Sequence, residues 1–351
     1  MGACGGSSAE EAGVGETAVR ADAPRVEVTA NEAEQRVDVR VDGELFTAYI
    51  WPSTLKKPTL FPLVTATGVP VTRGYPLEPR EGERTDHPHQ IGLWLNYGQV
   101  NGIDFWGNSD ARAPEEAPKL GSVVHRAVRG VESGAGVGAL EVTTEWVDHS
   151  GHALLREDTR YVFHAGENLR GVDRITTLTA LDQPVTFADT KEGMLGLRVA
   201  RALEQPSTEP VVLAEQDGST TTVPVADTAG VTGRYRSSEG LQGDSVWGTR
   251  ARWVALDGRV EGEPVTIAIL DHPTNPGYPT YWHARGYGLF SANPLGQKDF
   301  SGGAEELNLQ LQPGESTTMR YRVLILTGQD VTERIEAQYG DFAGRGAAEG
   351  S

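Results

Sequence analysis

The stretch that decides the fold is "GALEVTTEWVDHSGHALLREDTRYVFHAGENLRGVDRITTLTAL", residues 138–181. Apolar and polar residues alternate along most of it. This is the period of a half-buried β-strand, in which successive side chains point to opposite faces. Short segments that contain Gly interrupt the alternation and are typical of turns. The stretch therefore predicts a meander of consecutive antiparallel strands.

The same alternation recurs on both sides of this stretch. It is seen in "RVEVTA" and "QRVDVRVDG" near the start, and in "ARWVALDG" and "TTMRYRVLIL" toward the end. Helical periodicity is confined to residues 331–342. About 15–20 strands with no break in composition favour two large packed sheets in one domain. We therefore predict an all-β fold, a single large antiparallel β-sandwich with one short C-terminal helix.

Composition narrows the classes of partner. The formal net charge is −18, so a nucleic-acid backbone would be repelled and an anionic membrane surface would be too. No apolar run reaches the roughly 18 residues that a membrane-spanning helix needs. We expect a small-molecule ligand and no nucleic-acid partner, and the sequence leaves the oligomeric state open.

The ends of the chain differ from its centre. Residues 1–24 are small, acidic and without pattern, which predicts a disordered tether, followed by a sandwich domain over residues 25–343 and a tail over 344–351. The single cysteine, Cys4, follows Gly2 and Ala3 in "MGACGGSS", which resembles the end of a bacterial lipoprotein signal. A lipidated Cys4 would place the protein outside the cytoplasm, anchored to the cell envelope. An accidental Cys is the alternative.

The first candidate site stretch, rich in ionisable, amide and aromatic side chains, is "ERTDHPHQIGLWLNYGQVNGIDFWG", residues 83–107. Pro88 favours an extended His87, so His87 and His89 are expected to project together, with Asp86 orienting one imidazole. Aromatic faces beside amides and carboxylates suit a sugar ring, and the residues of this kind are Trp94, Asn96, Asn101, Asp104 and Trp106. The alternative is a loop whose His residues cap backbone groups and whose Trp residues fill the core.

A second stretch, "FADTKEGMLGLRV" at residues 187–199, brings three charges together before an apolar strand. Asp189, Lys191 and Glu192 can shift one another's pKa, and either carboxylate can serve as a general acid or base. An exposed turn with a local ion pair is the alternative reading.

The third stretch is "AILDHPTNPGYPTYWHARGYGLFSANPLGQKDF", residues 268–300. We expect a strand that ends at Asp271 and His272, followed by a long site-forming loop. We also expect the Asp-His-Pro of this stretch and that of the first stretch to form two walls of one cleft, with His272 among its catalytic residues and the second stretch as its third wall. The polar and aromatic side chains expected to line a site there are Asn275, Trp282, His283, Arg285 and Asn293. A packed connection that braces the sandwich is the alternative.

A bound metal ion is an alternative use of the histidines in these stretches. His87, His89, His272 and His283 include enough imidazoles for a metal site, although sugar sites also collect His residues for acid/base work. We therefore predict no cofactor. The sequence contains no nucleophile elbow, phosphate-binding loop or dinucleotide fingerprint.

These stretches together resemble a bacterial family catalogued as PmoA-like, or "methane oxygenase PmoA", otherwise a domain of unknown function. The resemblance covers roughly residues 40–326 and rests on "DHPHQIGLW", "NGIDFW", "FADTKEGMLGLRV", "ARWVAL" and "DHPTNPGYPTYWHARGYGLFSANPLG". Family members commonly continue Asp-His-Pro-His with His-Arg-Gly, whereas this chain has Gln90 and Ile91 before Gly92. Because the chain lacks a membrane span, we do not expect methane oxidation.

At the level of fold, the chain also resembles galactose-mutarotase-like supersandwich proteins, in its His and carboxylate residues on separate strands and its late "LQPGES" turn. The resemblance implies acid/base chemistry on a sugar, such as epimerisation, elimination or hydrolysis. We expect one His to act as general acid, Glu192 or Asp189 as general base, and Lys191 or Arg285 to stabilise negative charge. The alternatives are a non-catalytic carbohydrate-binding lipoprotein and a metal-dependent oxidoreductase.

Overall fold

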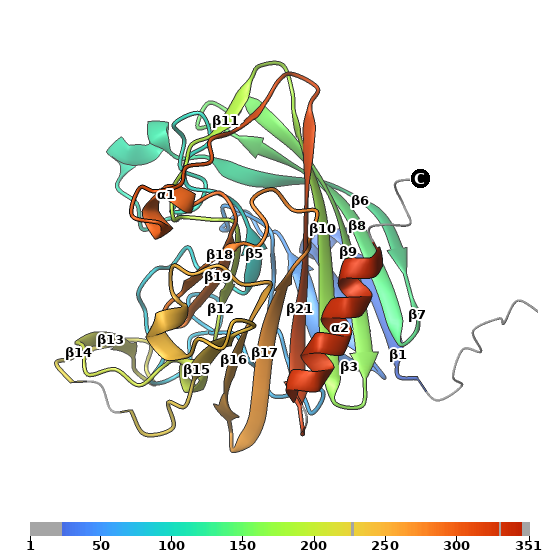
Figure 1. The fold of residues 1–351 in the computed structure, drawn as a ribbon, viewed down its shortest axis with the longest axis vertical. Helices are drawn as coiled ribbons and strands as arrows, with labels where there is room; N and C mark the ends of the chain where they lie inside the picture. Colours follow the sequence, from blue (N-terminus) through green and yellow to red (C-terminus); the bar gives the residue numbers. More distant parts are fainter. Residues whose placement is uncertain (1–22, 226–227, 330, 346–351) are drawn as a thin grey trace, which may run out of the picture.

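The computed structural model describes residues 23–225, 228–329 and 331–345. Most strands in these ranges belong to two large sheets that pack face to face (Figure 1). All the pairings between neighbouring strands in the two sheets are antiparallel. The predicted antiparallel β-sandwich with a C-terminal helix is therefore confirmed.

The nine-stranded sheet carries the strands that matter most for the site. In spatial order it contains β18 (Tyr281–Ala284), β19 (Leu289–Asn293), β12 (Leu195–Arg198), β5 (Leu93–Leu95), β4 (Thr59–Leu60), β3 (Glu44–Ile50), β2 (Arg36–Val41), β1 (Arg25–Asn31) and β7 (Gly134–Ala135).

The eight-stranded sheet contains the meander that the sequence predicts. Its order is β15 (Arg234–Ser237), β16 (Trp253–Val260), β17 (Glu263–Asp271), β21 (Ser316–Thr327), β10 (Leu169–Ala180), β9 (Ala153–Gly166), β8 (Val137–Val147) and β6 (Ser122–Glu132). Strands β8, β9 and β10 are consecutive neighbours, as the alternation in residues 138–181 indicates.

Smaller elements complete the described fold. Two further pairs of strands are β11 (Val185–Phe187) with β20 (Leu309–Leu311), and β13 (Val211–Ala214) with β14 (Thr220–Val223). The α-helices are α1 (Gln297–Phe300) and α2 (Val331–Arg345), and short 3-10 helices cover Glu32–Glu34, Pro114–Lys119, Arg201–Leu203 and Gly243–Val246. No helix of the described residues combines the length and the apolar character that crossing a membrane requires.

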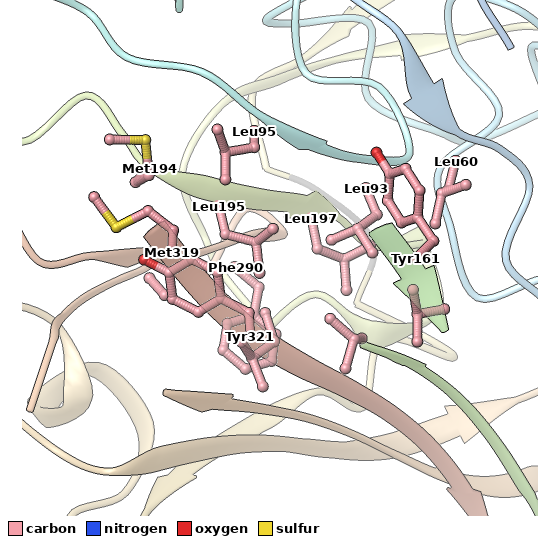
Figure 2. Close-up of a cluster of buried hydrophobic side chains, with 14 of the residues drawn as sticks. Leu60, Leu93, Leu95, Tyr161, Met194, Leu195, Leu197, Phe290, Met319 and Tyr321 are labelled. Atoms are coloured by element: carbon pink, nitrogen blue, oxygen red, sulfur yellow. The ribbon is translucent and has the colours of Figure 1, made fainter. Parts of the chain in front are cut away.

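The main core lies between the two sheets. Figure 2 shows Leu93, Leu195 and Phe290 of the nine-stranded sheet together with Met319 and Tyr321 of β21. All five side chains are buried. Burying apolar surface in this way is the main favourable term in folding.

The C-terminal helix covers the outer face of the eight-stranded sheet (Figure 1). Because strand side chains alternate, Tyr321 and Val323 of β21 enter the main core, while Leu324 points outward. Ile335 and Phe342 of α2 pack on this outer layer. Both faces of β21 are therefore covered toward its end, which explains the unbroken apolar run at residues 323–326.

The order of strands brings the three predicted stretches together. Each stretch leads into or contains one of the neighbouring strands β5, β12, β19 and β18, so their connections meet at one part of the nine-stranded sheet. The predicted long loop after Asp271 is only partly a loop. Its middle part, residues 281–293, forms the β18–β19 hairpin, because its apolar side chains fill the edge of that sheet and are buried there.

Candidate functional site

The site begins on the outer face of the nine-stranded sheet. Trp94 pairs with Gly196 of β12, where a Cβ atom would come within 2.4 Å of the Trp94 ring. Glycine at this position therefore makes room for the indole. Trp106 lies next to Trp94, with ring centroids 5.1 Å apart, and Leu289 completes this apolar floor.

Two buried arginines fix the loop that precedes β5. The Arg73 guanidinium donates hydrogen bonds to the backbone carbonyls of Asp86 at 2.7 Å, His87 at 2.9 Å and Gln90 at 3.0 Å. Arg198 donates to the side-chain oxygen of Gln90 at 2.5 Å. Arg73 is 1% exposed and Arg198 is fully buried, so this loop has a rigid support.

The Asp86 carboxylate joins these arginines to His87. One oxygen accepts hydrogen bonds from Arg198 at 2.7 Å and Arg73 at 3.1 Å, and the other lies 2.7 Å from Nδ1 of His87. Burial acts to raise the pKa of Asp86, but the His87 hydrogen bond and the two arginine charges outweigh burial and hold the pKa well below its usual range. The ionised carboxylate therefore accepts the Nδ1 proton and leaves Nε2 of His87 available.

The backbone conformation of His87 and the contacts of its ring fix the orientation of the imidazole. The backbone φ of His87 is +47°, in the left-handed region that non-glycine residues rarely adopt, so the extended conformation predicted for His87 from Pro88 is wrong. The ring stacks on Tyr287 with parallel planes and centroids 5.1 Å apart, and meets His89 edge-on at 5.7 Å. The His87 side chain is still 40% exposed. An exposed imidazole held by several neighbours has the geometry of a preorganised acid/base group.

Glu192 lies on the connection before β12, and its carboxyl is within electrostatic reach of His87. Burial raises the pKa of Glu192, and the charge of Asp104 raises it further, whereas Lys191 and His87 lower it. The side chain is 37% exposed, and the nearest Lys191 contact is 3.8 Å. A Cβ atom on Gly98 would meet Glu192 Cβ at 2.8 Å, so glycine there allows the connection to approach.

Asp104 and Lys57 form a second ionisable pair beside the apolar floor. Burial lowers the pKa of Lys57 to about 7, and the charge of Asp104 opposes that shift. Lys57 Nζ donates to the carbonyl of His89 at 2.6 Å and lies 5.3 Å from the Trp94 ring centroid. Burial likewise raises the pKa of Asp104. Burial lowers the pKa of His89 to about 2, so this imidazole stays neutral.

His283 holds the Glu192 connection in place. It is 3% exposed, and its Nδ1 lies 3.1 Å from the carbonyl oxygen of Lys191. Burial lowers the pKa of His283 to about 4, and the nearby charges of Arg285 and Lys191 act in the same direction. A neutral ring then donates its Nδ1 proton to that carbonyl, which is a positioning role.

Cavities lie on two sides of these groups. The Lys57 cavity has a volume of about 440 Å³, and Lys57, Tyr75, His89 and Asn108 contribute to its lining. The Arg285 cavity has a volume of about 470 Å³, and its lining includes Trp247, Arg285 and Tyr287. Both volumes are within the range of small-ligand sites.

The structure gathers about half of the predicted site residues. Those that it brings together are Asp86, His87, His89, Asp104, Lys191, Glu192, His283 and Arg285. Trp94 and Trp106 lie beneath them as the floor. The remaining predicted site residues form contacts that support the fold.

The predicted aromatic platforms are buried. Trp94, Trp106 and Trp282 are at most 2% exposed. Trp94 Nε1 donates to Asn96 Oδ1 at 3.1 Å, and Trp282 Nε1 donates to the carbonyl of Ala251 at 2.9 Å. These rings offer no face to a ligand in this structure, because adjacent strands and loops cover them.

Several polar side chains predicted to line the site instead form hydrogen bonds with backbone groups. Asp189 accepts hydrogen bonds from the N–H groups of Lys298 and Leu307, which ties the second stretch to the segment around α1. Asn293 donates to the carbonyl of Thr190 at 2.9 Å, and Asn101 donates to that of Pro184 at 3.0 Å. Each of these side chains fixes a loop.

The second Asp-His-Pro stretch lies apart from the first. Asp271 is fully buried and accepts hydrogen bonds from Asn275 at 2.7 Å and from the N–H of Thr280 at 2.8 Å. The His272 ring packs edge-on against Phe342 of α2, on the outer side of the eight-stranded sheet. The structure therefore does not bring His272 to His87.

Sequence reasoning missed several residues of the site, namely Lys57, Arg73, Arg198 and Trp247. A lone basic residue in an apolar run, as in "GLRV", is a usable signal, because a buried charge requires partners. Nothing local in the sequence distinguishes Trp247, 37% exposed, from the buried tryptophans.

The described residues contain no group of three or more His, Cys, Asp and Glu side chains placed to hold a metal ion. Cys4, the predicted lipidation site, lies outside the described residues.

A protein-family model matches residues 36–340, nearly the whole described domain. The chain belongs to a family of unknown function, DUF6807. That description assigns no activity to the family. No comparison bears on the PmoA label, which stays a prediction from the sequence. The search of curated proteins found no match.

Solved structures were also compared with the DUF6807 chain. A GH36 α-galactosidase from Geobacillus stearothermophilus is 12% identical with a TM-score of 0.40, and the match covers 86% of this chain and 41% of that one. A putative aldose 1-epimerase from Escherichia coli is 11% identical with a TM-score of 0.30, covering 86% and 99%. A galactose mutarotase-like protein from Clostridium acetobutylicum is 10% identical with a TM-score of 0.36, covering 86% and 98%.

The DUF6807 chain thus spans about two fifths of the length of the α-galactosidase that it matches. Galactose-mutarotase-like proteins are among the similar structures, as the resemblance from sequence implies. A likeness at TM-scores of 0.30 to 0.40 assigns no function to this chain. Function depends on the residues of a site and not on the fold alone.

Proposed function

We propose that this protein acts on a carbohydrate by acid/base chemistry at the His87 site, defined as Asp86, His87, Glu192 and the surrounding side chains. The observation that carries the proposal is the Asp86–His87 pair, 2.7 Å apart, with the half-buried Glu192 carboxyl in electrostatic reach of His87. Two proton-carrying groups with different environments are what acid/base catalysis requires.

The roles follow from the surroundings of each group. The ionised Asp86 stabilises positive charge on the His87 ring, so a protonated His87 can give its Nε2 proton to a sugar oxygen. The raised pKa of Glu192 makes its carboxylate a stronger base than an exposed one. Glu192 would therefore remove a proton from the sugar or, in a hydrolysis, from the attacking water, and Lys191 beside it would stabilise the negative charge that develops.

A sugar fits this site because flat apolar surface and polar groups lie side by side. Tyr287 and the exposed Trp247 line the Arg285 cavity, next to the stacked His87. The C–H face of a pyranose packs on aromatic rings, and its hydroxyl groups bond to polar side chains. Epimerisation and elimination combine removal of a proton from the sugar with donation of a proton to a sugar oxygen. Hydrolysis combines donation of a proton to the leaving oxygen with removal of a proton from the attacking water. All three use one acid and one base, and all three belong to this proposal.

Turnover of a panel of glycosides, including oxidised sugars, tests the proposal. Wild-type protein is compared with His87→Ala and Glu192→Gln, and binding of each sugar is measured in parallel. Turnover by the wild type that both substitutions abolish would support the enzyme. Binding that both variants retain, without turnover by any of them, would favour a carbohydrate-binding protein instead.

The location of the protein is a separate proposal from sequence. Lipidation of Cys4 would anchor the protein outside the cytoplasm. The test is incorporation of labelled palmitate into the full chain, with Cys4→Ser as the control. Incorporation in both proteins, or in neither, would overturn the proposal.

A further inference from the structure

The Arg285 guanidinium stands between two aromatic rings. Arg285 lies in the turn between β18 and β19 and is exposed. Its central carbon is 5.8 Å from the Trp247 ring centroid and 5.6 Å from that of Tyr287. Within the described residues no carboxylate pairs with it and no acceptor receives its side-chain N–H groups. The rings thus orient a cation whose hydrogen-bond donors remain open.

The other charged side chains of the Arg285 cavity are arranged differently. Arg84 donates to Glu204 at 2.7 Å, so its charge is neutralised inside the protein. Asp244 accepts a hydrogen bond from Gln205 at 2.6 Å. Glu209 is exposed to solvent. Among the cations of this cavity, Arg285 is therefore the one that offers its donors to an occupant.

The Arg285 cavity connects with the acid/base groups through Tyr287. His87 stacks on the Tyr287 ring at 5.1 Å, and Arg285 approaches the same ring. The charges of Arg285 and Glu192 both act on the Tyr287 hydroxyl. Tyr287 lines the cavity and His87 stacks on the same ring, so a ligand that contacts Arg285 and extends past Tyr287 would reach His87.

We propose that the substrate of the His87 site is an acidic sugar whose carboxylate pairs with Arg285. This inference rests on the proposed carbohydrate function and specifies the class of sugar. The planar guanidinium presents two parallel N–H groups that match the two oxygens of a carboxylate. The flanking rings hold the fork in one orientation, which reduces the entropy lost on binding. A local cation of this kind is needed in a chain with a net charge of −18.

The test is calorimetric titration of the full chain with matched ligands. The probes are the methyl glycosides of galacturonate and glucuronate, their methyl esters, the corresponding neutral sugars and galactose 6-sulfate. The ester keeps the size of the acid and removes its charge. We expect the acid to bind at least about tenfold more tightly than its ester, since a hydrogen bond to a charged group contributes roughly 1.5–3 kcal/mol.

Substitutions assign the difference to Arg285. Arg285→Gln should remove the preference for the acid and change the affinity for the ester by no more than about twofold. Arg285→Lys should retain only part of the preference for the acid, since a Lys ammonium lacks the two parallel N–H groups of a guanidinium. Arg234→Gln is the control, because Arg234 is also exposed but does not line this cavity. Thermal denaturation of each variant checks the fold.

Each outcome decides the inference. A preference for the acid that Arg285→Gln removes and Arg234→Gln keeps supports it. Equal binding of acid and ester, or a preference that survives in Arg285→Gln, overturns it and leaves the carbohydrate function standing. Tighter binding of the sulfate than of either uronate overturns the choice of a carboxylate. If no sugar of the panel binds, both the acidic-sugar inference and the proposed carbohydrate function are contradicted.

Discussion

Arg198 donates a hydrogen bond to the Asp86 carboxylate over 2.7 Å, although 112 residues separate the two in the sequence. Through this contact β12 orients the imidazole of His87, because the second oxygen of Asp86 accepts the Nδ1 proton. The same carboxylate is the counter-ion of the buried Arg73. One side chain thus serves both the stability of the loop and the geometry of the candidate acid/base group.

Replacing Asp86 with Asn should therefore lower both stability and activity. The substitution leaves two buried guanidinium groups without their counter-ion, and we expect unfolding free energy to fall by about 2–3 kcal/mol. Urea denaturation measures the change. Glu27→Gln is the control, since Glu27 forms an exposed pair with Arg25 that should contribute under about 1 kcal/mol. If Asp86→Asn lowered the unfolding free energy as little as Glu27→Gln does, the role assigned to Asp86 would be contradicted.

Glu192→Gln should affect catalysis and spare the fold. The amide keeps the shape of the carboxyl and cannot accept a proton, so we expect kcat to fall by about 10²–10⁴-fold, with binding retained. Glu32→Gln, an exposed residue of the first 3-10 helix, is the matched control. The pH–rate profile provides a second readout, because the limb due to Glu192 should disappear. A wild-type profile in the variant would show that Glu192 is not the base.

Lys57 should make stability depend on pH above neutrality. Its pKa is lowered to about 7 in the folded protein, so between about pH 7 and pH 10 the unfolded chain binds more protons than the folded one. Unfolding free energy should rise with pH across this window, by roughly 3 kcal/mol between pH 7 and pH 9.5. Lys57→Met should remove that part of the slope. An identical slope in the variant would contradict the assignment.

Substitution of Trp94 and of Trp247 should have different effects on stability and on ligand binding. Trp94→Ala removes a fully buried side chain from the floor and should cost about 3–5 kcal/mol of unfolding free energy. Trp247→Ala removes a partly exposed ring, so it should cost far less stability and weaken ligand binding instead. Denaturation and titration with the same sugars separate the two effects. A large loss of stability in Trp247→Ala would contradict its place on the cavity wall.

The architecture could be predicted because it depends on local periodicity. Alternation in residues 138–181 indicates three strands whatever they pack against, and β8, β9 and β10 are neighbours as expected. His87 of the first stretch and Glu192 of the second, both predicted as catalytic residues, lie within electrostatic reach of each other. The β18–β19 hairpin was harder to predict, because a Pro- and Gly-rich stretch is typical of loops, and its edge position depends on a distant strand, β12.

The sequence by itself determined the strand pattern, the acidic surface charge and the grouping of His87, His89, Lys191 and Glu192 near strand ends. Only the tertiary structure decided which side chains face a cavity. Trp94 and Trp247 are the same residue type, yet strand pairing covers one and leaves the other on a cavity wall. Two copies of Asp-His-Pro look alike in sequence, but one is held by Arg73 and Arg198 and the other packs under α2. Burial and partner contacts arise from strand order, which no local pattern encodes.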